Sequence, residues 1–168
     1  MLVLTSDHGE SFGKLAADHE QTLHMTSVYP EQMRVPLMIR WPRRMAGSRV
    51  AQQTVSLKQV PATIEALLDG EARVFPAPMD LTGAASAEEG CVFGDLRELQ
   101  GRRTQAMVAC GPWQFVRREQ NEELYNLQTD PGARINLVTS DDAAPQRDRM
   151  RSLLHHWLQE QDEAVLRR

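Results

Sequence analysis

The chain has 168 residues, of which 41% are hydrophobic and 25% charged, a composition typical of one folded domain and unlike disordered, collagen-like or coiled-coil proteins. Its net charge is −4, and 19 basic and 23 acidic residues are spread along the sequence, so no basic surface for nucleic acid is predicted. No apolar run approaches the roughly 20 residues of a membrane helix, and two cysteines are too few for a disulfide scaffold. We expect a soluble chain without nucleic-acid or membrane partners, whose core does not depend on crosslinks.

The first predicted element is the apolar run Leu2–Leu4, which leads into the polar, glycine-containing loop Thr5–Glu10 without a targeting sequence before it. The run predicts a short buried parallel strand. In open α/β sheets, ligands bind beyond the carboxyl ends of such strands, where Asp7 and His8 would stand. A chain that begins inside a strand also suggests that an upstream segment is missing.

Three further segments complete the first half. After the polar stretch Ser11–Ser27, the apolar centre of Arg34–Pro42 lies between prolines and predicts a second buried strand. Apolar residues between Val55 and Leu68 recur at helical spacing and predict a helix that packs on the sheet. Residues 71–90 are rich in Pro, Ala, Gly and acidic residues without a period, which predicts a surface connector.

The second half has the pattern of antiparallel structure. Two β-like runs, Gln105–Ala109 and Trp113–Arg117, are joined by Cys110–Pro112 and predict a hairpin. The segment Glu123–Leu127 then leads into a turn at Asp130–Gly132.

The last predicted element is an amphipathic helix from Pro145 onward. Apolar residues fall at i, i+3, i+4, i+7 and i+8 counted from Met150, which forms one helical stripe. The layout is therefore α/β in the first half, followed by a small antiparallel α+β portion.

Asp7 and His8 are the first candidates for chemistry. A carboxylate oxygen and an imidazole nitrogen suit a divalent cation, and a loop just beyond a strand can turn both side chains toward one ion. The alternative is an aspartate that starts a turn beside a surface histidine. Two ligands do not complete a site, because a cation such as Ca²⁺ takes about six to eight oxygens.

The remaining histidines and the cysteine motif give weaker indications of a catalytic or metal-binding role. His19 and His24 are five residues apart, roughly 140° around a helix, so the zinc-protease motif is not predicted. His24 alone suits a proton donor or an anion ligand, or else it is a solvated loop residue. Cys110–Trp113 resembles a redox motif whose second cysteine is replaced, and one cysteine cannot perform dithiol exchange. His155 and His156 point about 100° apart on the last helix and are predicted to be solvated.

Taken together, the segments resemble the second half of a sulfatase of the alkaline phosphatase superfamily. The loop Leu4–Glu10 and the segment Tyr29–Ile39 are similar to two of its motifs in order and spacing. Further ordered matches support the family's next helix and its closing signature, Glu-Leu-Tyr-Asp-Leu with Asp-Pro and Asn-Leu after it: Val55–Leu57, Pro61–Ile64, Glu123–Leu127, Asp130–Pro131 and Asn136–Leu137.

The resemblance implies a fold class and a division into domains. Residues 1–80 would be the C-terminal part of an α/β, alkaline-phosphatase-like sheet-and-helix catalytic domain, and residues 81–90 a connector. Residues 91–168 would form a small antiparallel sheet subdomain with the C-terminal amphipathic helix.

The resemblance also implies site residues. Asp7 and His8 match metal ligands, usually to Ca²⁺, with Mg²⁺ or Mn²⁺ as alternatives. His24 is the best match to a residue that contacts the sulfate or the leaving-group oxygen, and Lys14 and His19 are weaker candidates for substrate binding. A histidine suits this role, because its cation neutralises the anionic ester and a donor with a pKa of about 6.5 can protonate a leaving alkoxide.

Two family elements are absent from this sequence, an early pair of aspartates and a Cys/Ser-x-Pro-x-Arg segment whose Cys or Ser becomes the formylglycine nucleophile. Cys110–Gln114 imitates that segment, but Gln114 replaces the arginine and the motif follows Asp7 instead of preceding it. We therefore expect a fragment of a sulfatase that hydrolyses small-molecule sulfate esters with a divalent metal and an upstream formylglycine, and that is inactive or nearly so when isolated.

Two alternatives stay open at this point. A phosphodiesterase, phosphonate monoester hydrolase or phosphoglycerol transferase of the same superfamily would share the Asp-His motif and act on a phosphate ester. The chain could also be a non-catalytic remnant or a binding module. Metal titration separates a retained half-site from a remnant.

Overall fold

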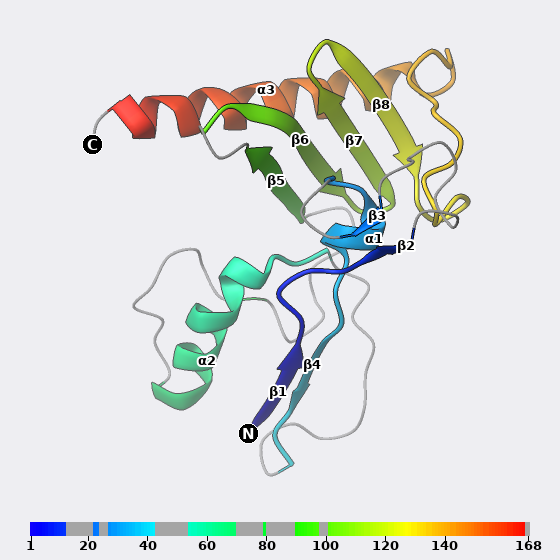
Figure 1. Ribbon diagram of the computed structural model, residues 1–168. Helices are drawn as coiled ribbons and strands as arrows, with labels where there is room; N and C mark the ends of the chain where they lie inside the picture. The colour runs from blue at the N-terminus through cyan, green and yellow to red at the C-terminus, as the bar shows by residue number, and fades with distance from the viewer. Residues whose placement is uncertain are drawn as a thin grey trace. The chain divides into compact units, whose positions relative to one another are not determined.

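The computed structural model describes residues 1–12, 22–23, 27–42, 54–69, 79, 90–97 and 101–166. Figure 1 shows the helices and strands formed by these residues. The chain separates into two compact units, one made of residues 1–48, 93–108 and 113–168, the other of residues 49–92 and 109–112. The domain limits inferred from the sequence stay a prediction.

A four-stranded sheet provides most of the first unit. Its strands lie in chain order, and the short turns between the last three make a meander: β5 (Cys91–Arg97), β6 (Arg103–Cys110), β7 (Trp113–Arg118) and β8 (Asn121–Asn126). Gly111, between β6 and β7, has a φ of 53°, which glycine adopts readily. The predicted hairpin over residues 105–117 is confirmed.

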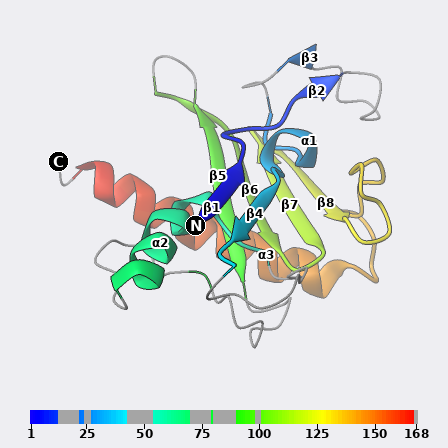
Figure 2. The same ribbon diagram turned by 90° about the horizontal axis from the view of Figure 1, so that it is seen from below.

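The two faces of this sheet have different partners, because neighbouring residues of a strand point to opposite sides. Glu122 and Glu123 are neighbours in β8. Glu122 forms an ion pair with Arg151 of helix α3 (Ala144–Leu166), whereas Glu123 accepts a hydrogen bond from Tyr29. Helix α3 and the segment around Tyr29 therefore lie on opposite faces of the sheet, as Figures 1 and 2 also show.

Helix α3 buries the apolar stripe that the sequence predicts. Met150, Leu154 and Leu158 retain 0%, 1% and 4% of their exposure. Full burial of such a side chain contributes about 1.5–3 kcal/mol to folding. Trp157 adds a stacked contact with Phe93, with 5.4 Å between ring centroids. The predicted C-terminal amphipathic helix is confirmed.

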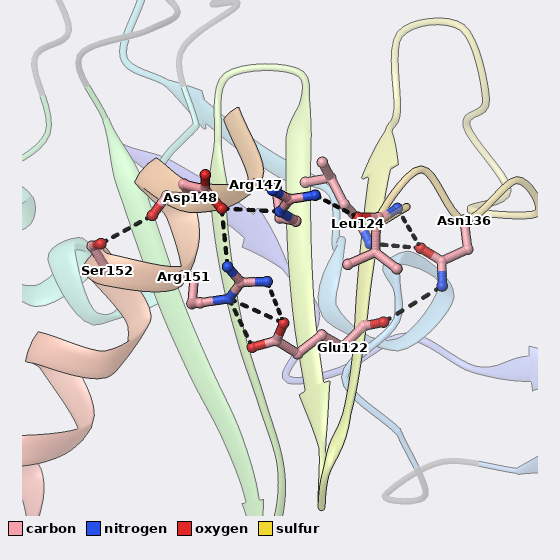
Figure 3. Close-up of polar contacts among 8 residues, drawn as sticks. Glu122, Leu124, Asn136, Arg147, Asp148, Arg151 and Ser152 are labelled. Atoms are coloured by element: carbon pink, nitrogen blue, oxygen red, sulfur yellow. Dashed lines mark hydrogen bonds and ion pairs between the residues drawn. The ribbon is translucent and has the colours of Figure 1, made fainter. Parts of the chain in front are cut away.

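Polar contacts fasten the start of α3 to β8 (Figure 3). The guanidinium of Arg151 donates to both carboxylate oxygens of Glu122, at 2.6 and 3.0 Å, and to Asp148 at 2.9 Å. Beside this pair, the Oδ1 of Asn136 accepts from the backbone N–H groups of Leu124 and Val138, each at 3.0 Å. Asn136 thereby fixes the chain that leads from β8 toward α3.

A second, two-stranded sheet carries the loop of interest. Strand β1 (Leu2–Thr5) pairs antiparallel with β4 (Leu37–Arg40), and Leu4 lies opposite Met38. The side chains of Leu2, Leu4 and Met38 are 58%, 46% and 59% exposed. The prediction of two buried strands, the first parallel, is therefore wrong in direction and burial. An apolar run specifies a strand, but its pairing depends on residues far along the chain.

The other short elements of this unit precede β4. Strand β2 (Ser11–Phe12) pairs antiparallel with β3 (Thr22–Leu23). Helix α1 (Pro30–Met33) is a single turn that begins after Tyr29. It places Tyr29, which is fully buried, next to the sheet.

The second unit contains the predicted helix. A 3₁₀ turn, η1 (Leu57–Gln59), leads directly into α2 (Val60–Asp69). Ser56 and Gln59 form a capping box. Gln59 Oε1 accepts from the N–H of Ser56, and Ser56 Oγ accepts from the N–H of Lys58 in the first turn, so the helix begins where backbone N–H groups are satisfied. The predicted connector over residues 71–90 lies outside the described residues, except for Met79 and Gly90.

The same unit contains a disulfide between Cys91 and Cys110, which are 19 positions apart. The sequence led us to expect a core that does not depend on crosslinks and did not predict this pair, because two cysteines this far apart have no local pairing signal. Within the part of the chain that the structure describes, no helix has the length and hydropathy needed to cross a membrane.

Candidate functional site

The loop that follows β1 is held by its own hydrogen bonds. Ser6 Oγ donates to the carbonyl oxygen of His8 at 2.7 Å, and the N–H of His8 donates to Asp7 Oδ1 at 3.0 Å. This backbone hydrogen bond is the main cause that lowers the pKa of Asp7. The Asp7 side chain is 86% exposed, so an ionised carboxylate faces solvent at the end of the strand.

The imidazole of His8 has a defined orientation. Its Nδ1 lies 2.8 Å from the carbonyl oxygen of Gly9. A carbonyl oxygen only accepts, so Nδ1 carries a proton and the neutral ring has its lone pair on Nε2. A metal-binding histidine commonly has this arrangement, in which one ring nitrogen donates a hydrogen bond and the other is left to bind the ion.

The donor atoms of this pair fit a common cation. His8 Nε2 and Asp7 Oδ2 are 3.8 Å apart. Two ligands that each lie roughly 2.3–2.6 Å from one ion can be separated by at most about 5 Å, so both atoms can reach the same metal. Among the described residues, including this loop, no group of three or more His, Cys, Asp or Glu side chains is placed to hold a metal ion. By itself, this pair does not make a complete metal site, and its role as a ligand pair stays a prediction.

Gly9 joins this loop to helix α1. Its N–H donates to the carbonyl oxygen of Gln32 at 2.8 Å. A Cβ at position 9 would overlap the carbonyl oxygen of Glu31, so only glycine allows the backbone of the loop to approach the helix this closely. The position of Asp7 and His8 thus depends on the position of α1.

The segment before α1 is held by hydrogen bonds to side chains of the four-stranded sheet. The N–H of Val28 donates to Gln105 Oε1 at 3.3 Å, and Gln114 Nε2 donates to the carbonyl oxygen of Val28 at 2.8 Å. Gln105 and Gln114 are 5% and 2% exposed. Two buried side-chain amides therefore satisfy both backbone polar groups of Val28, as a neighbouring strand would.

A buried carboxylate completes this junction. Glu123 Oε2 accepts hydrogen bonds from the hydroxyls of Tyr29, at 2.6 Å, and Tyr125, at 2.8 Å, and Arg118 donates to Oε1 at 3.3 Å. The two rings meet edge to face, with 6.3 Å between centroids. Burial, followed by the hydrogen bonds to Glu123 and its negative charge, raises the pKa of both phenols, so they remain donors.

The structure brings together two of the predicted site residues. Asp7 and His8 are adjacent and oriented as described, whereas Lys14, His19 and His24 lie outside the described residues and stay predictions. Sequence reasoning missed Gly9 and Glu123. The signal for both was present, a glycine after Asp-His and a glutamate in the closing signature, but it did not reveal their partners.

Residues 1–70 match the sulfatase family. This stretch includes the Asp-His-Gly loop, α1, β4 and α2. A search among curated proteins found no match.

Solved structures with the same fold are sulfatases. A protein of Bacteroides thetaiotaomicron assigned as a sulfatase has 22% identity and a TM-score of 0.73, over 99% of this chain and 37% of its own. The protein yidJ of Bacteroides fragilis, likewise assigned, has 16% identity and a TM-score of 0.76, over 95% and 36%. A third, solved in complex with its substrate D-glucosamine-2-N,6-O-disulfate, has 19% identity and a TM-score of 0.67, over 96% and 34%.

These comparisons confirm the resemblance and the fold class inferred from the sequence. The fold is that of a C-terminal part of a sulfatase, with a mixed α/β character. The chain spans about a third of the length of the solved structures that it matches.

Proposed function

We propose that this chain, which has the fold of a sulfatase and matches that family over residues 1–70, supplies the Asp7–His8 part of a divalent-metal site in an enzyme that hydrolyses sulfate esters. The observation that carries the proposal is the pair itself. An ionised Asp7 carboxylate and a histidine whose tautomer is fixed by Gly9 have donor atoms 3.8 Å apart at the end of a strand.

The metal is proposed to be Ca²⁺, with Mg²⁺ or Mn²⁺ as alternatives. A carboxylate oxygen suits all three ions, and the imidazole nitrogen adds a ligand that Mn²⁺ also accepts. When bound, the ion would act as a Lewis acid on the sulfate group and so stabilise the charge of the transition state.

The chain's own residues have three tasks in this proposal. Asp7 and His8 hold the ion and fix its place relative to the strand end. His24 donates a proton to the leaving alkoxide, and Lys14 and His19 contribute positive charge that binds the anionic ester. A formylglycine nucleophile would come from residues outside these 168.

The proposed substrate is a small-molecule sulfate ester. A solved protein of the same fold binds a sulfated glucosamine, which supports this class of ligand. The exposed face of the β1–β4 sheet, with Leu2, Leu4 and Met38, supports the further proposal that the site is completed by additional polypeptide, because the matched sulfatases are about three times as long. On its own, the chain should therefore turn over little or no substrate.

Calorimetric titration of the purified chain with Ca²⁺ tests the metal site. We expect weak binding, with a Kd of roughly 1 mM, because the chain offers only part of a coordination shell. Asp7→Asn should abolish it. Asp142→Asn, at another exposed aspartate, is the matched control and should leave it unchanged.

Two results would contradict the proposal. Wild-type protein that binds no Ca²⁺, Mg²⁺ or Mn²⁺ at millimolar concentration would indicate a non-catalytic remnant. Robust hydrolysis of an aryl sulfate by the isolated chain at saturating Ca²⁺ would show that its own residues suffice, and so refute the incomplete site.

A further inference from the structure

Glu123 is a buried acidic residue that has no part in the proposed chemistry. Its side chain is 11% exposed, and three donors surround it, the hydroxyls of Tyr29 and Tyr125 and the guanidinium of Arg118. A buried carboxylate is costly unless all its hydrogen bonds are made. Here both oxygens are engaged, so the donors are held in fixed positions around the carboxylate.

One of these donors leads from the sheet to the candidate metal site. The carbonyl oxygen of Tyr29 accepts from the N–H groups of Gln32 and Met33, both at 3.0 Å, and so begins helix α1. The carbonyl oxygen of Gln32 in turn accepts from Gly9. The path from the Glu123 carboxylate to the Asp7–His8–Gly9 loop thus consists of three hydrogen-bonded steps.

The residues at both ends of this hydrogen-bonded path are held in place by further contacts. At the sheet, Tyr29 is fully buried, and Gln114 and Gln105 hold the preceding residue, Val28, by its backbone. At the loop, Gly9 lies so close to α1 that a Cβ would overlap the Glu31 carbonyl oxygen, so the loop and the helix are in direct backbone contact. A displacement of Tyr29 therefore moves α1 and the loop that is docked on it.

We infer that Glu123 is a positioning residue for the Asp7–His8 pair, acting through Tyr29, α1 and Gly9. The effect of this positioning on metal binding rests on the proposed function. The hydrogen-bonded path from Glu123 to Gly9 does not depend on it. The inference assigns the four-stranded sheet a role beyond its own stability, since one face of it sets the place of the loop after β1.

The test is amide hydrogen exchange, measured by NMR on the isotope-labelled full chain. Glu123→Gln keeps the size of the side chain but removes its charge and replaces one acceptor oxygen with an NH₂ group. The three donors can then no longer all be accepted, and the hydrogen bond from Tyr29 is weakened. We expect exchange of the Gly9 amide proton to accelerate roughly tenfold, the loss expected for a hydrogen bond to a charged group. The Leu154 amide in α3, which reports opening of the whole unit, should keep its rate.

Glu122→Gln is the matched control, because Glu122 is adjacent but lies on the opposite face and pairs with Arg151. It should leave the Gly9 rate unchanged. The inference is overturned if folded Glu123→Gln protein exchanges Gly9 at the wild-type rate, if Glu122→Gln accelerates Gly9 equally, or if Gly9 and Leu154 accelerate by the same factor.

A second pair of variants covers the case in which Glu123→Gln does not fold. Tyr29→Phe and Tyr125→Phe each remove one hydroxyl from the same carboxylate, but only Tyr29 begins α1. Tyr29→Phe should accelerate Gly9 exchange, and Tyr125→Phe should do so much less. Equal rates in the two variants would overturn the inference.

The metal-site proposal is judged separately in the same samples. Chemical-shift changes of Asp7 and His8 on addition of Ca²⁺ to wild-type protein support that site, and Glu123→Gln should then weaken the Ca²⁺ affinity. If wild-type protein shows no such changes, the metal site fails while the Gly9 exchange rates still decide whether Glu123 positions the loop.

Discussion

Gly9 decides how closely the candidate site approaches α1. Its N–H reaches Gln32, and any side chain would meet the carbonyl oxygen of Glu31. Backbone atoms cannot move aside as a flexible side chain can. At this one position, therefore, the requirement for glycine comes from space and not from an unusual φ.

We expect Gly9→Ala to destabilise the chain by about 1–3 kcal/mol, the usual cost of forcing extra atoms into a packed region. Urea unfolding measures the change. Gly132→Ala is the control, because the nearest atoms there belong to the flexible Arg134 side chain, at 3.2 Å. A Gly9→Ala variant as stable as Gly132→Ala would contradict the crowding.

The two tyrosines around Glu123 predict a response to alkaline pH. Their pKa is raised in the folded chain, by burial first and then by Glu123, whereas an unfolded tyrosine has a pKa of about 10. Above that pH the unfolded state releases protons that the folded state retains. The stabilising effect is thus complete below pH 10 and is lost as the pH rises further.

Each such tyrosine adds a slope of about 1.4 kcal/mol per pH unit to the fall in stability. Urea unfolding between pH 8 and 12 should show a shallower fall for the double variant Tyr29→Phe, Tyr125→Phe, which contains no tyrosine, because these two are the only ones in the chain. Identical slopes in variant and wild type would show that neither pKa is raised.

At the scale of single residues, the sequence predicted the candidate ligands Asp7 and His8 but not the residues that support their loop. Asp7 and His8 are identified by a local motif whose meaning depends only on neighbours. The partners of Gly9 and Glu123 lie 23 and 94 positions away, at Gln32 and Tyr29, and no local pattern contains such a distance. The residues that hold a site in place are therefore harder to predict than those that carry its chemistry.

At the scale of elements, helix α3 is the covering layer of the four-stranded sheet. Its buried stripe consists of Met150, Leu154 and Leu158, and its polar side is tied to β8 through Arg151. Apolar burial contributes more than the ion pair, because the Arg151 side chain is 44% exposed and such pairs contribute about 1 kcal/mol or less.

Truncation of a residue in the buried stripe should show how much apolar burial contributes to stability. Leu154→Ala is expected to lower the free energy of unfolding by about 2–5 kcal/mol, since it leaves a cavity in a closed core. Leu153→Ala, at the adjacent half-buried leucine, is the control and should cost clearly less. Equal losses in urea unfolding would indicate that α3 is not packed as described.

Elements with a local signal were predicted well, and the pairing of strands that lie far apart in the sequence was not. The helix α3 follows from a spacing of three and four residues, and the β6–β7 hairpin from two runs beside a short turn. The direction of β1 and its exposure could not be read in the same way. Its partner β4 is more than 30 residues away, and an apolar strand looks alike whether it is parallel or antiparallel.

At the scale of the whole molecule, the β1–β4 sheet presents an apolar face. Leu4 lies opposite Met38 and two positions from Leu2, so the three exposed side chains point to the same side. Contiguous exposed apolar surface of this kind favours association. We expect the isolated chain to self-associate through this face as its concentration rises.

Sedimentation velocity measures this association. Met38→Lys should reduce it strongly, because a charge would have to be buried in the contact. Ile135→Lys is the control, at an apolar residue that is 63% exposed in a loop outside either sheet. The prediction is wrong if wild-type protein remains monomeric at high concentration, or if the two variants associate equally.

The hydrogen bonds of Asn136 have a consequence for the free edge of the four-stranded sheet. Strand β8 has β7 on one side only, so its outer backbone groups could recruit a foreign strand. At Leu124, however, the N–H is already taken by the Asn136 side chain and the carbonyl by the N–H of Leu137. The chain segment after β8 thus occupies both backbone groups of Leu124, so a foreign strand cannot pair with β8 at this residue.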